Sequence, residues 1–350
     1  AKEIVLVVKL EEMVNLVTEE NITSPNVEPT KSNRLFIVRS AKDLPNNEFA
    51  ITTVRLFSKE EIGRFAGMLQ DPARIMAGYG GMSNIDDYNN HLSVRGGSPS
   101  LFQWRVDGIP VQNPNHLSTF GATGGKQNIL NPNTIDNSDL YLGGSPAEMG
   151  NSAGAVFDAT LHKGNEESFE FLLQTSGTTG LQAMLEGPLS KKKNGSFMAA
   201  FRYNLFNFVN YNLVQLSAPS QNYETFSTAP RYWDYTVKVD LPKGKAGEFS
   251  FFSIGGFASE QMDGTDSIYA DRNPYVQRNE QRFLETNIGI VGLRHRIALG
   301  KRQQGYLTTR IGGTFTQIEN NSKLLLQNDD FDWFFNNVND RFSFVLSSNL

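Results

Sequence analysis

The sequence predicts a mixed α/β domain followed by the antiparallel β strands of an incomplete transmembrane β-barrel. The first observation is a segment ending near residue 165 that is rich in glycine and tight turns. The second is a run of later strands in which apolar and polar residues alternate. The third is that the connections between these strands are alternately short and long, which is typical of outer-membrane barrels.

The composition fits this class and excludes several others. The chain has 350 residues, no cysteine and a net charge of −5, which excludes disulfides and cysteine-ligated metal centres. Its mean hydropathy is −0.37, and no stretch approaches the roughly 18 apolar residues of a transmembrane helix. Barrel strands escape that test because only alternate residues face lipid. The 25 phenylalanines fit aromatic girdles at two membrane interfaces.

The N-terminal region is expected to be a strand followed by a linker. Residues 4–10 (IVLVVKL) read as the strand, and residues 11–33 are polar and contain Pro25 and Pro29. Because Ala1 is not an initiator methionine and the last residues lie inside an alternating segment, we expect the chain to be a piece of a longer protein.

Two helices and a turn are expected next. Ser58 can cap a helix over 59–70, and Asp71-Pro72 begins a second helix that ends at Gly80-Gly81. Short strands are predicted at 92–95 and 103–107. The second strand ends in Asp107-Gly108, where glycine permits a turn with positive φ.

Eight alternating strands are predicted after residue 166. In 232–241 the odd positions are apolar, such as Trp233 and Val237, and most even positions are polar, such as Asp234 and Lys238. This pattern requires a sheet with one apolar face. The eight candidates are 169–175, 181–186, 196–204, 232–241, 248–260, 283–299, 306–319 and 341–350.

The connections between these strands fall into two classes. Three are short and basic, namely 188–195, 242–247 and 300–305, and they alternate with long ones at 205–231, 261–282 and 320–339. This is the pattern of periplasmic turns and extracellular loops. A barrel of about eight strands is filled by its own side chains and cannot hold a separate domain, whereas plugged barrels have about 22 strands. Most of the barrel is therefore expected to lie outside this sequence.

Two motifs in this order resemble a known family. Residues 92–111 (LSVRGGSPSLFQWRVDGIPV) resemble the plug-domain signature of TonB-dependent outer-membrane receptors. Residues 145–164 (SPAEMGNSAGAVFDATLHKG) resemble the last strands of that plug, just before the barrel. The resemblance covers roughly 49–204 and is most specific between 92 and 164.

Further segments resemble a subgroup of these receptors with a carboxypeptidase-regulatory-like domain before the plug. These are 41–67, 71–74 (DPAR) and 113–116 (NPNH). The resemblance divides the chain into four parts. They are the last strand of a truncated regulatory-like domain (1–12), a linker (13–48), the plug (49–165) and the first eight or so barrel strands (166–350).

The resemblance implies active import of a ligand across the outer membrane. The plug would lie inside the barrel lumen and gate it, with the N-terminus in the periplasm. The energy-coupling protein TonB would add a strand to an extended segment of the linker. Our candidate segment is Met13, Val14, Asn15, Leu16 and Val17, although it departs from the family's usual Val/Thr-rich sequence. An ordinary linker patch explains these residues equally well.

Arg95 and Glu148 are the charged residues embedded in the two motifs. In similar receptors, charged plug residues face the barrel wall and act as a releasable latch, and breaking one such pair in a partly buried site is costly. The alternative for Arg95 is that it only satisfies carbonyl groups within the plug.

Ligand contact is expected from two plug loops that should face outward. They comprise Ser98, Pro99, Ser100, Leu101 and Phe102 in the first loop, and Asn115, His116 and Leu117, continuing to Ser118, in the second. Solvated turn tips are the simpler explanation for any one of these residues. The imported ligand would be a siderophore, cobalamin, a glycan or a peptide, and a surface lipoprotein is a further possible partner.

Other chemistries have little support. The four histidines, His91, His116, His162 and His295, are scattered, and Asp329, Asp330 and Asp332 lack the spacing of a calcium loop. No hydrolase elbow or phosphate-binding loop is present, so we expect neither an enzyme nor a cofactor or metal. An acidic chain is not expected to bind nucleic acid. The rival hypothesis is a soluble β-rich module that binds a glycan or protein through long loops such as 205–230.

Overall fold

The computed structural model is mostly β strands with few helices. It describes residues 45–47, 50, 54–57, 70–85, 89–119, 121, 123–176, 180–190, 195–204, 230–242, 244, 246–264, 277, 279–300, 305–326 and 331–349. The predicted strand at 4–10, the TonB segment at 13–17, the helix over 59–70 except Gln70 and the long connection after residue 204 lie outside these residues.

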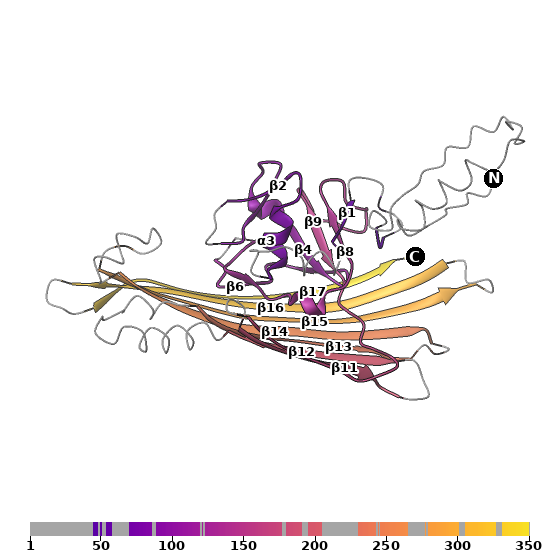
Figure 1. Ribbon diagram of the computed structural model, residues 1–350. Coiled ribbons are helices and arrows are strands. Elements are labelled where there is room, and N and C mark those ends of the chain that lie inside the picture. The colour runs from indigo at the N-terminus through magenta and orange to yellow at the C-terminus, as the bar shows by residue number, and fades with distance from the viewer. Residues whose placement is uncertain are drawn as a thin grey trace, which may run out of the picture.

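Eight antiparallel strands form one large sheet in sequence order. Among the described residues the first and last strands do not pair with each other, so the sheet is not closed. Figure 1 shows a smaller unit, here called the inner body (the described residues from 45 to 165), on one face of this sheet. The strands of the large sheet are β10 (Glu170–Ser176), β11 (Gly180–Pro188), β12 (Ser196–Tyr203), β13 (Arg231–Asp240), β14 (Glu248–Asp263), β15 (Glu280–Leu299), β16 (Gly305–Leu325) and β17 (Phe331–Asn349).

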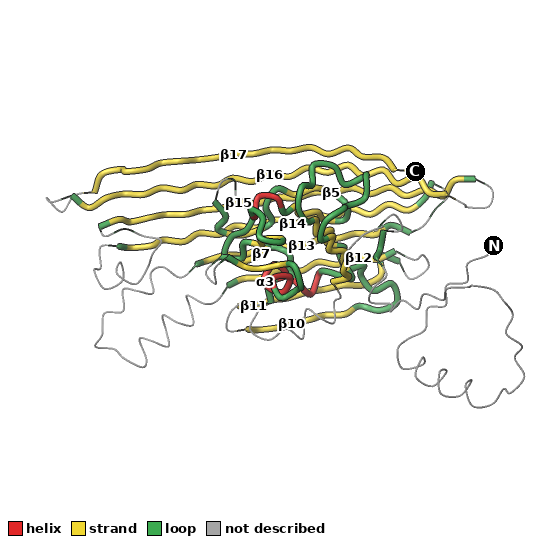
Figure 2. Tube along the Cα trace, turned by 90° about the horizontal axis from the view of Figure 1, so that it is seen from above, coloured by secondary structure: helices red, strands yellow, loops and turns green. Residues whose placement is uncertain are grey.

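The prediction of eight antiparallel strands after residue 166 is confirmed, but one predicted connection is wrong. Residues 320–339 were expected to be a long loop, whereas β16 continues to Leu325 and β17 begins at Phe331. Asn320 pairs with Asn337 in this ladder. The polar run at 319–323 and the register shift after Ser322 hid this part of β16, because they break the apolar alternation that marks a strand. Figure 2 shows these long strands running past the inner body at one end.

The two faces of the large sheet differ in the sense opposite to that of a water-soluble sheet. In β13, Asp234 and Thr236 are each 1% exposed, whereas the intervening apolar positions turn away and Trp233 is 38% exposed. Phe344 of β17 is 88% exposed. The alternation was thus correctly predicted, and the structure adds that in β13 the polar positions are the buried ones. Within the described part of the chain, no helix is long and apolar enough to cross a membrane.

The inner body is built on a five-stranded sheet with the order β1-β8-β9-β4-β5. Its strands are β1 (Val54–Phe57), β4 (Gln103–Val106), β5 (Ile109–Val111), β8 (Ser138–Tyr141) and β9 (Val156–Ala159). Two small hairpins flank it, β2 (Met82–Asn84) with β3 (Leu92–Val94), and β6 (Asn115–His116) with β7 (Gln127–Asn128). Its helices are α3 (Pro72–Ala77) and the 3₁₀ turns η2 (Pro99–Leu101) and η3 (Pro132–Thr134).

Local sequence explains these elements. Asp71 caps α3 as predicted and accepts hydrogen bonds from the backbone N–H groups of Ala73 and Arg74, and Pro72 occupies the first turn, where its missing N–H costs nothing. The helix ends at Ala77, one turn before the predicted Gly80-Gly81. The strands predicted at 92–95 and 103–107 are β3 and β4. Gly108 adopts φ +82°, as the predicted turn requires.

One apolar core joins the inner body to the large sheet. Phe157 contacts Trp104 edge to face, with ring centroids 5.7 Å apart, and the same cluster includes Phe252 and Ile290 of the large sheet. Ile109 lies over two glycines that pair with each other in β15 and β16, Gly292 and Gly312. A Cβ atom at either glycine would come within 2.6 Å of Ile109. The pair of glycines therefore makes room for this side chain.

Candidate functional site

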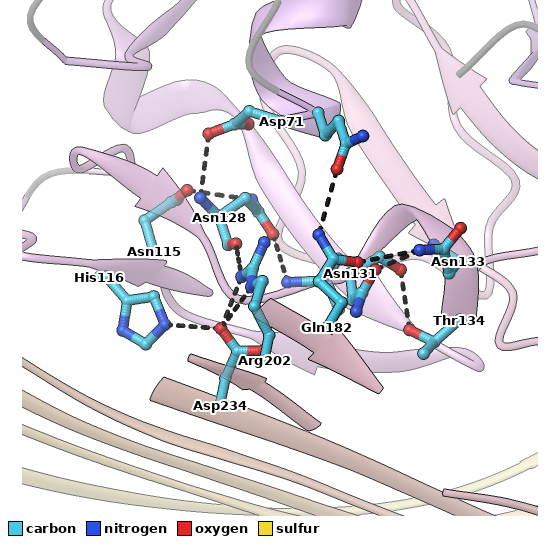
Figure 3. A network of polar contacts seen from close by, with 12 residues as sticks. Asp71, Asn115, His116, Asn128, Asn131, Asn133, Thr134, Gln182, Arg202 and Asp234 are labelled. Atoms are coloured by element: carbon cyan, nitrogen blue, oxygen red, sulfur yellow. Dashed lines mark hydrogen bonds and ion pairs between the residues drawn. The ribbon is translucent and has the colours of Figure 1, made fainter. Parts of the chain in front are cut away.

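The candidate site is the polar interface between the inner body and the large sheet. Figure 3 shows the network at its centre, which begins at the helix cap. The Asp71 carboxylate accepts hydrogen bonds from Asn90 Nδ2 at 2.8 Å and from the backbone N–H of Asn128 at 3.0 Å. Asn90 also donates to Asn115 Oδ1, and Asn115 Nδ2 donates to Asn113 Oδ1. These buried amides satisfy one another, which is the condition for a stable polar interior.

The network reaches the large sheet through β6. His116 Nε2 lies 3.0 Å from Asp234 Oδ2 on β13, and the same oxygen accepts hydrogen bonds from Arg202 of β12 at 2.9 and 2.6 Å. Arg202 also donates to the carbonyl oxygen of Asn128 in the inner body. The imidazole stacks on Tyr232, with ring centroids 4.9 Å apart. Burial lowers the pKa of His116, so its neutral form is favoured.

A second ionic contact lies at the turn between β4 and β5. Asp107 Oδ2 is 3.0 Å from Lys238 Nζ of β13, and both side chains are almost completely buried. Lys238 also donates to the carbonyl oxygen of Leu161, whose N–H donates to Asp107 Oδ1. Each charge thus has a partner and a further hydrogen bond, which offsets part of the cost of removing it from water.

Two more charged groups lie beside this turn. Asp158 of β9 accepts a hydrogen bond from the N–H of Gly108 at 2.9 Å, and burial raises its pKa to about 6. The side chain of Arg310 of β16 lies on the other side of the turn. A Cβ atom added to Gly108 would come within 2.5 Å of Arg310 Nε. Burial lowers the pKa of Arg105, which has the charge of Asp158 beside it.

Further pairs connect the two units along the interface. Lys126 forms a short contact with Glu260 of β14, and burial lowers the pKa of Lys126 to about 8. His162 Nε2 is 2.9 Å from Glu186 Oε2 of β11. The backbone N–H of Leu117 donates to Thr286 Oγ1 of β15 at 3.0 Å. The interface therefore combines ion pairs, amide contacts and backbone hydrogen bonds across five strands of the wall.

The residues predicted for ligand contact separate into two groups. Ser98 caps η2, and Ser98, Ser100 and Leu101 are exposed, as expected of an outward loop. Pro99 is half-buried, and Phe102 is buried against Trp104 with ring centroids 5.0 Å apart. The second group does not face outward. Asn115, His116, Leu117 and Ser118 are all buried, and His116 and Leu117 form hydrogen bonds with the large sheet.

The two residues predicted to act as a latch against the barrel wall, Arg95 and Glu148, are both exposed. Arg95 is exposed, adopts φ +50° and lies near Gly143. Glu148 is exposed and accepts hydrogen bonds from Asn47 and from Asn349 at the end of β17. Neither residue belongs to an ion pair among the described residues.

Sequence reasoning missed Asp107, Arg202, Asp234 and Lys238 as interface residues, although a signal for three of them was present. Arg202, Asp234 and Lys238 occupy polar positions of alternating strands, opposite the apolar face. Charges at these positions of neighbouring strands predict a partly charged wall, and the inner body supplies partners such as His116 and Asp107. Among the described residues, no group of three or more acidic or histidine side chains could hold a metal ion.

A cavity of about 500 Å³ lies beside this network. It is bounded by η2 and the start of β4, by the segments that follow β5 and β6, and by the inner faces of β16 and β17. Three of the predicted ligand residues, Ser100, Leu101 and Phe102, line it.

The comparisons with known proteins give structural matches only. No protein-family model matches the sequence, and no curated protein matches it. The structure is similar to a mutant of the ferric enterobactin receptor PfeA from Pseudomonas aeruginosa, with 15% identity, 84% of this chain and 45% of that chain covered, and a TM-score of 0.48.

Two further solved structures show the same kind of similarity. The ferric-catecholate import receptor Fiu from E. coli K12 has 10% identity, 85% and 45% coverage and a TM-score of 0.49. The pyoverdine outer membrane receptor FpvA from Pseudomonas aeruginosa PAO1 has 13% identity, 89% and 54% coverage and a TM-score of 0.43. The chain spans about half the length of the solved structures it matches.

Proposed function

We propose that this chain is the plug and the first part of the barrel wall of a TonB-dependent outer-membrane receptor that imports a ligand. One observation carries the proposal. The inner body contacts the buried face of the large sheet through ion pairs as well as through a shared apolar core, whereas the opposite face of the sheet is apolar and exposed. Water as the only solvent would favour the reverse arrangement, because exposed apolar surface is unfavourable there.

The apolar face is continuous from strand to strand. Leu346 pairs with Ile311, Ile311 with Leu293, Leu293 with Phe251, and Phe251 with Val239. Such rows fit the outward band of an outer-membrane barrel, about 25 Å tall. A membrane crossing needs only about 9–11 residues. The 20, 21 and 19 residues of β15, β16 and β17 therefore leave room to extend beyond the lipid.

The remaining roles follow from the family resemblance of the two motifs. The inner body gates the lumen, Arg95 and Glu148 contribute to a releasable latch, and TonB binds residues 13–17 from the periplasm. The contact of Glu148 with Asn349 supports a position of this residue next to the wall. The loop at Ser98–Phe102 contacts the imported ligand, and a surface lipoprotein is a further candidate partner.

The test uses the full-length protein that contains this chain. We expect it in the outer-membrane fraction, extracted only by detergent, with an electrophoretic mobility that changes on heating as a closed barrel unfolds. Recovery as a soluble monomer without detergent would contradict the proposal and favour the soluble binding module. A periplasmic soluble protein expressed alongside serves as the fractionation control.

A further inference from the structure

The cavity between the inner body and β16–β17 has an unusual distribution of charge. Its volume of about 500 Å³ lies within the range of small-molecule sites. Of the described residues that line it, Arg341 is the one charged residue, and none is a carboxylate. The polar groups of the lining are otherwise amides and hydroxyls, among them Gln103, Asn113, Thr316 and Asn339.

The inner-body side of the cavity is held in place by hydrogen bonds. Asn113 Nδ2 donates to the carbonyl oxygen of Gly124 at 2.9 Å, and Asn113 Oδ1 accepts from Asn115. The indole N–H of Trp104 donates to the carbonyl oxygen of Thr123 at 2.9 Å. Polar groups fixed in this way lose little entropy when they bind a ligand.

The sheet side presents side chains and not strand edges. Thr316 pairs with Arg341, and Ile318 pairs with Asn339, so the backbone groups of β16 and β17 here bond each other. A ligand therefore cannot join by strand addition between them and must be recognised by side chains. Amide side chains both donate and accept hydrogen bonds, and they match groups that do the same, such as hydroxyls and amides.

We propose that this cavity binds an uncharged ligand rich in hydroxyl or amide groups, and not a polyanionic iron chelate. A polyanion needs several cationic partners to offset its loss of water, and the described residues of the lining supply one. The apolar part of the lining, which includes Phe102 and Val345, accommodates the C–H faces of such a ligand. This inference rests on the proposed function, because it identifies the class of the imported ligand.

The test is calorimetric titration of the detergent-solubilised full-length protein. The probes are neutral oligosaccharides, tripeptides blocked at both ends, and a ferric catecholate as the polyanion. We expect a neutral probe to bind, and Thr316→Val and Asn339→Leu each to weaken its binding about 5- to 10-fold. Thr309→Val, on the same strand but on the opposite face, is the matched control and should leave binding unchanged.

Each outcome decides the proposal. Binding of the sugars alone or of the blocked peptides alone supports it and identifies the source of the hydroxyl or amide groups. The proposal is overturned if no neutral probe binds at millimolar concentration, or if the ferric catecholate binds and Thr316→Val weakens it. Membrane fractionation of the same preparation tests the proposed function separately, so a membrane-inserted protein that binds no neutral probe overturns this inference alone.

Discussion

The ion pair between Asp107 and Lys238 joins the inner body to the wall where both side chains are almost completely buried. Lys238→Met should destabilise the detergent-solubilised protein by about 3–5 kcal/mol, because Asp107 would remain buried without its counter-charge. Equilibrium unfolding measures this loss.

Two comparisons make this prediction specific to burial. Asp107→Asn combined with Lys238→Met should recover part of the loss, since no unpaired charge remains. Lys163→Met removes a solvent-exposed ion pair with Glu166 and should change stability by no more than about 0.5 kcal/mol. Equal losses in the Lys238 and Lys163 variants would show that the buried pair has no special weight.

Gly108 is constrained both by its backbone and by its neighbour. It adopts φ +82°, and a Cβ would overlap the side chain of Arg310. Gly108→Ala should cost about 1–3 kcal/mol for the backbone conformation, plus the displacement of Arg310. Gly96 has φ +75°, and a Cβ atom at this position would have no neighbouring atom within 4 Å. Gly96→Ala therefore gives the backbone cost alone. If the two variants unfold at the same denaturant concentration, displacing the side chain of Arg310 has no measurable cost.

Asp158 should make stability depend on pH. Burial raises its pKa to about 6, whereas an aspartate in the unfolded chain has a pKa near 3.9. The folded state therefore binds the proton more tightly. Its stabilising contribution is complete below about pH 4 and is lost as the pH rises through about 6.

Asp158→Asn, which stays neutral and can still accept the Gly108 hydrogen bond, should flatten this part of the profile. Thermal unfolding between pH 4 and pH 7 checks it, with the variant compared with the parent because nearby Asp107, Arg105 and Arg310 also contribute to the field. Identical slopes in parent and variant would remove Asp158 as the cause.

At the scale of single strands, alternation decides which solvent each face contacts. Val291 of β15 is 46% exposed on the outward face, and Asn287 lies four residues away on the same face, where its side chain donates a hydrogen bond to Gln317. Val291→Arg should weaken insertion into lipid by about 2–4 kcal/mol, whereas Asn287→Arg should cost at most about 1 kcal/mol. Urea titration of folding into vesicles measures both. Equal insertion costs for the two variants would show that the lipid-facing band is not centred near Val291.

The strands were predictable from sequence where period two was clear, as in β13, and not where polar residues occupied both faces, as in β16 beyond residue 320. The orientation of the faces was not fixed by the pattern, since the same alternation fits a soluble sandwich. The site was less predictable still. Asn115 and His116 have the composition of a surface loop, and their burial depends on amide and ionic partners distant in sequence, such as Asn90 and Asp234.

For the whole molecule, the proposed gating predicts that Leu117 is accessible only when the inner body moves. Leu117 is 3% exposed, and this sequence has no cysteine, so Leu117→Cys adds one label site, and the full-length protein without this substitution gives the background labelling. In energised cells we expect maleimide labelling of this variant, and a protonophore should suppress it. Ser98→Cys, at an exposed position, should be labelled in both conditions. Equal labelling of Leu117→Cys with and without the protonophore would contradict gating by movement of the inner body.

The glycine pair beneath Ile109 has a consequence for how the inner body is oriented around the axis of the curved wall. Rotation by one strand, or sliding by two residues, would bring Ile109 against positions that carry a Cβ, whereas Gly292 and Gly312 offer none. Gly256 of β14 likewise makes room for the side chain of His116, because a Cβ atom at Gly256 would come within 2.8 Å of the imidazole. Two separate recesses define one angle and one height. If the inner body moves away from the wall, these two recesses allow it to return to one position only. Its polar contacts alone could form at several positions.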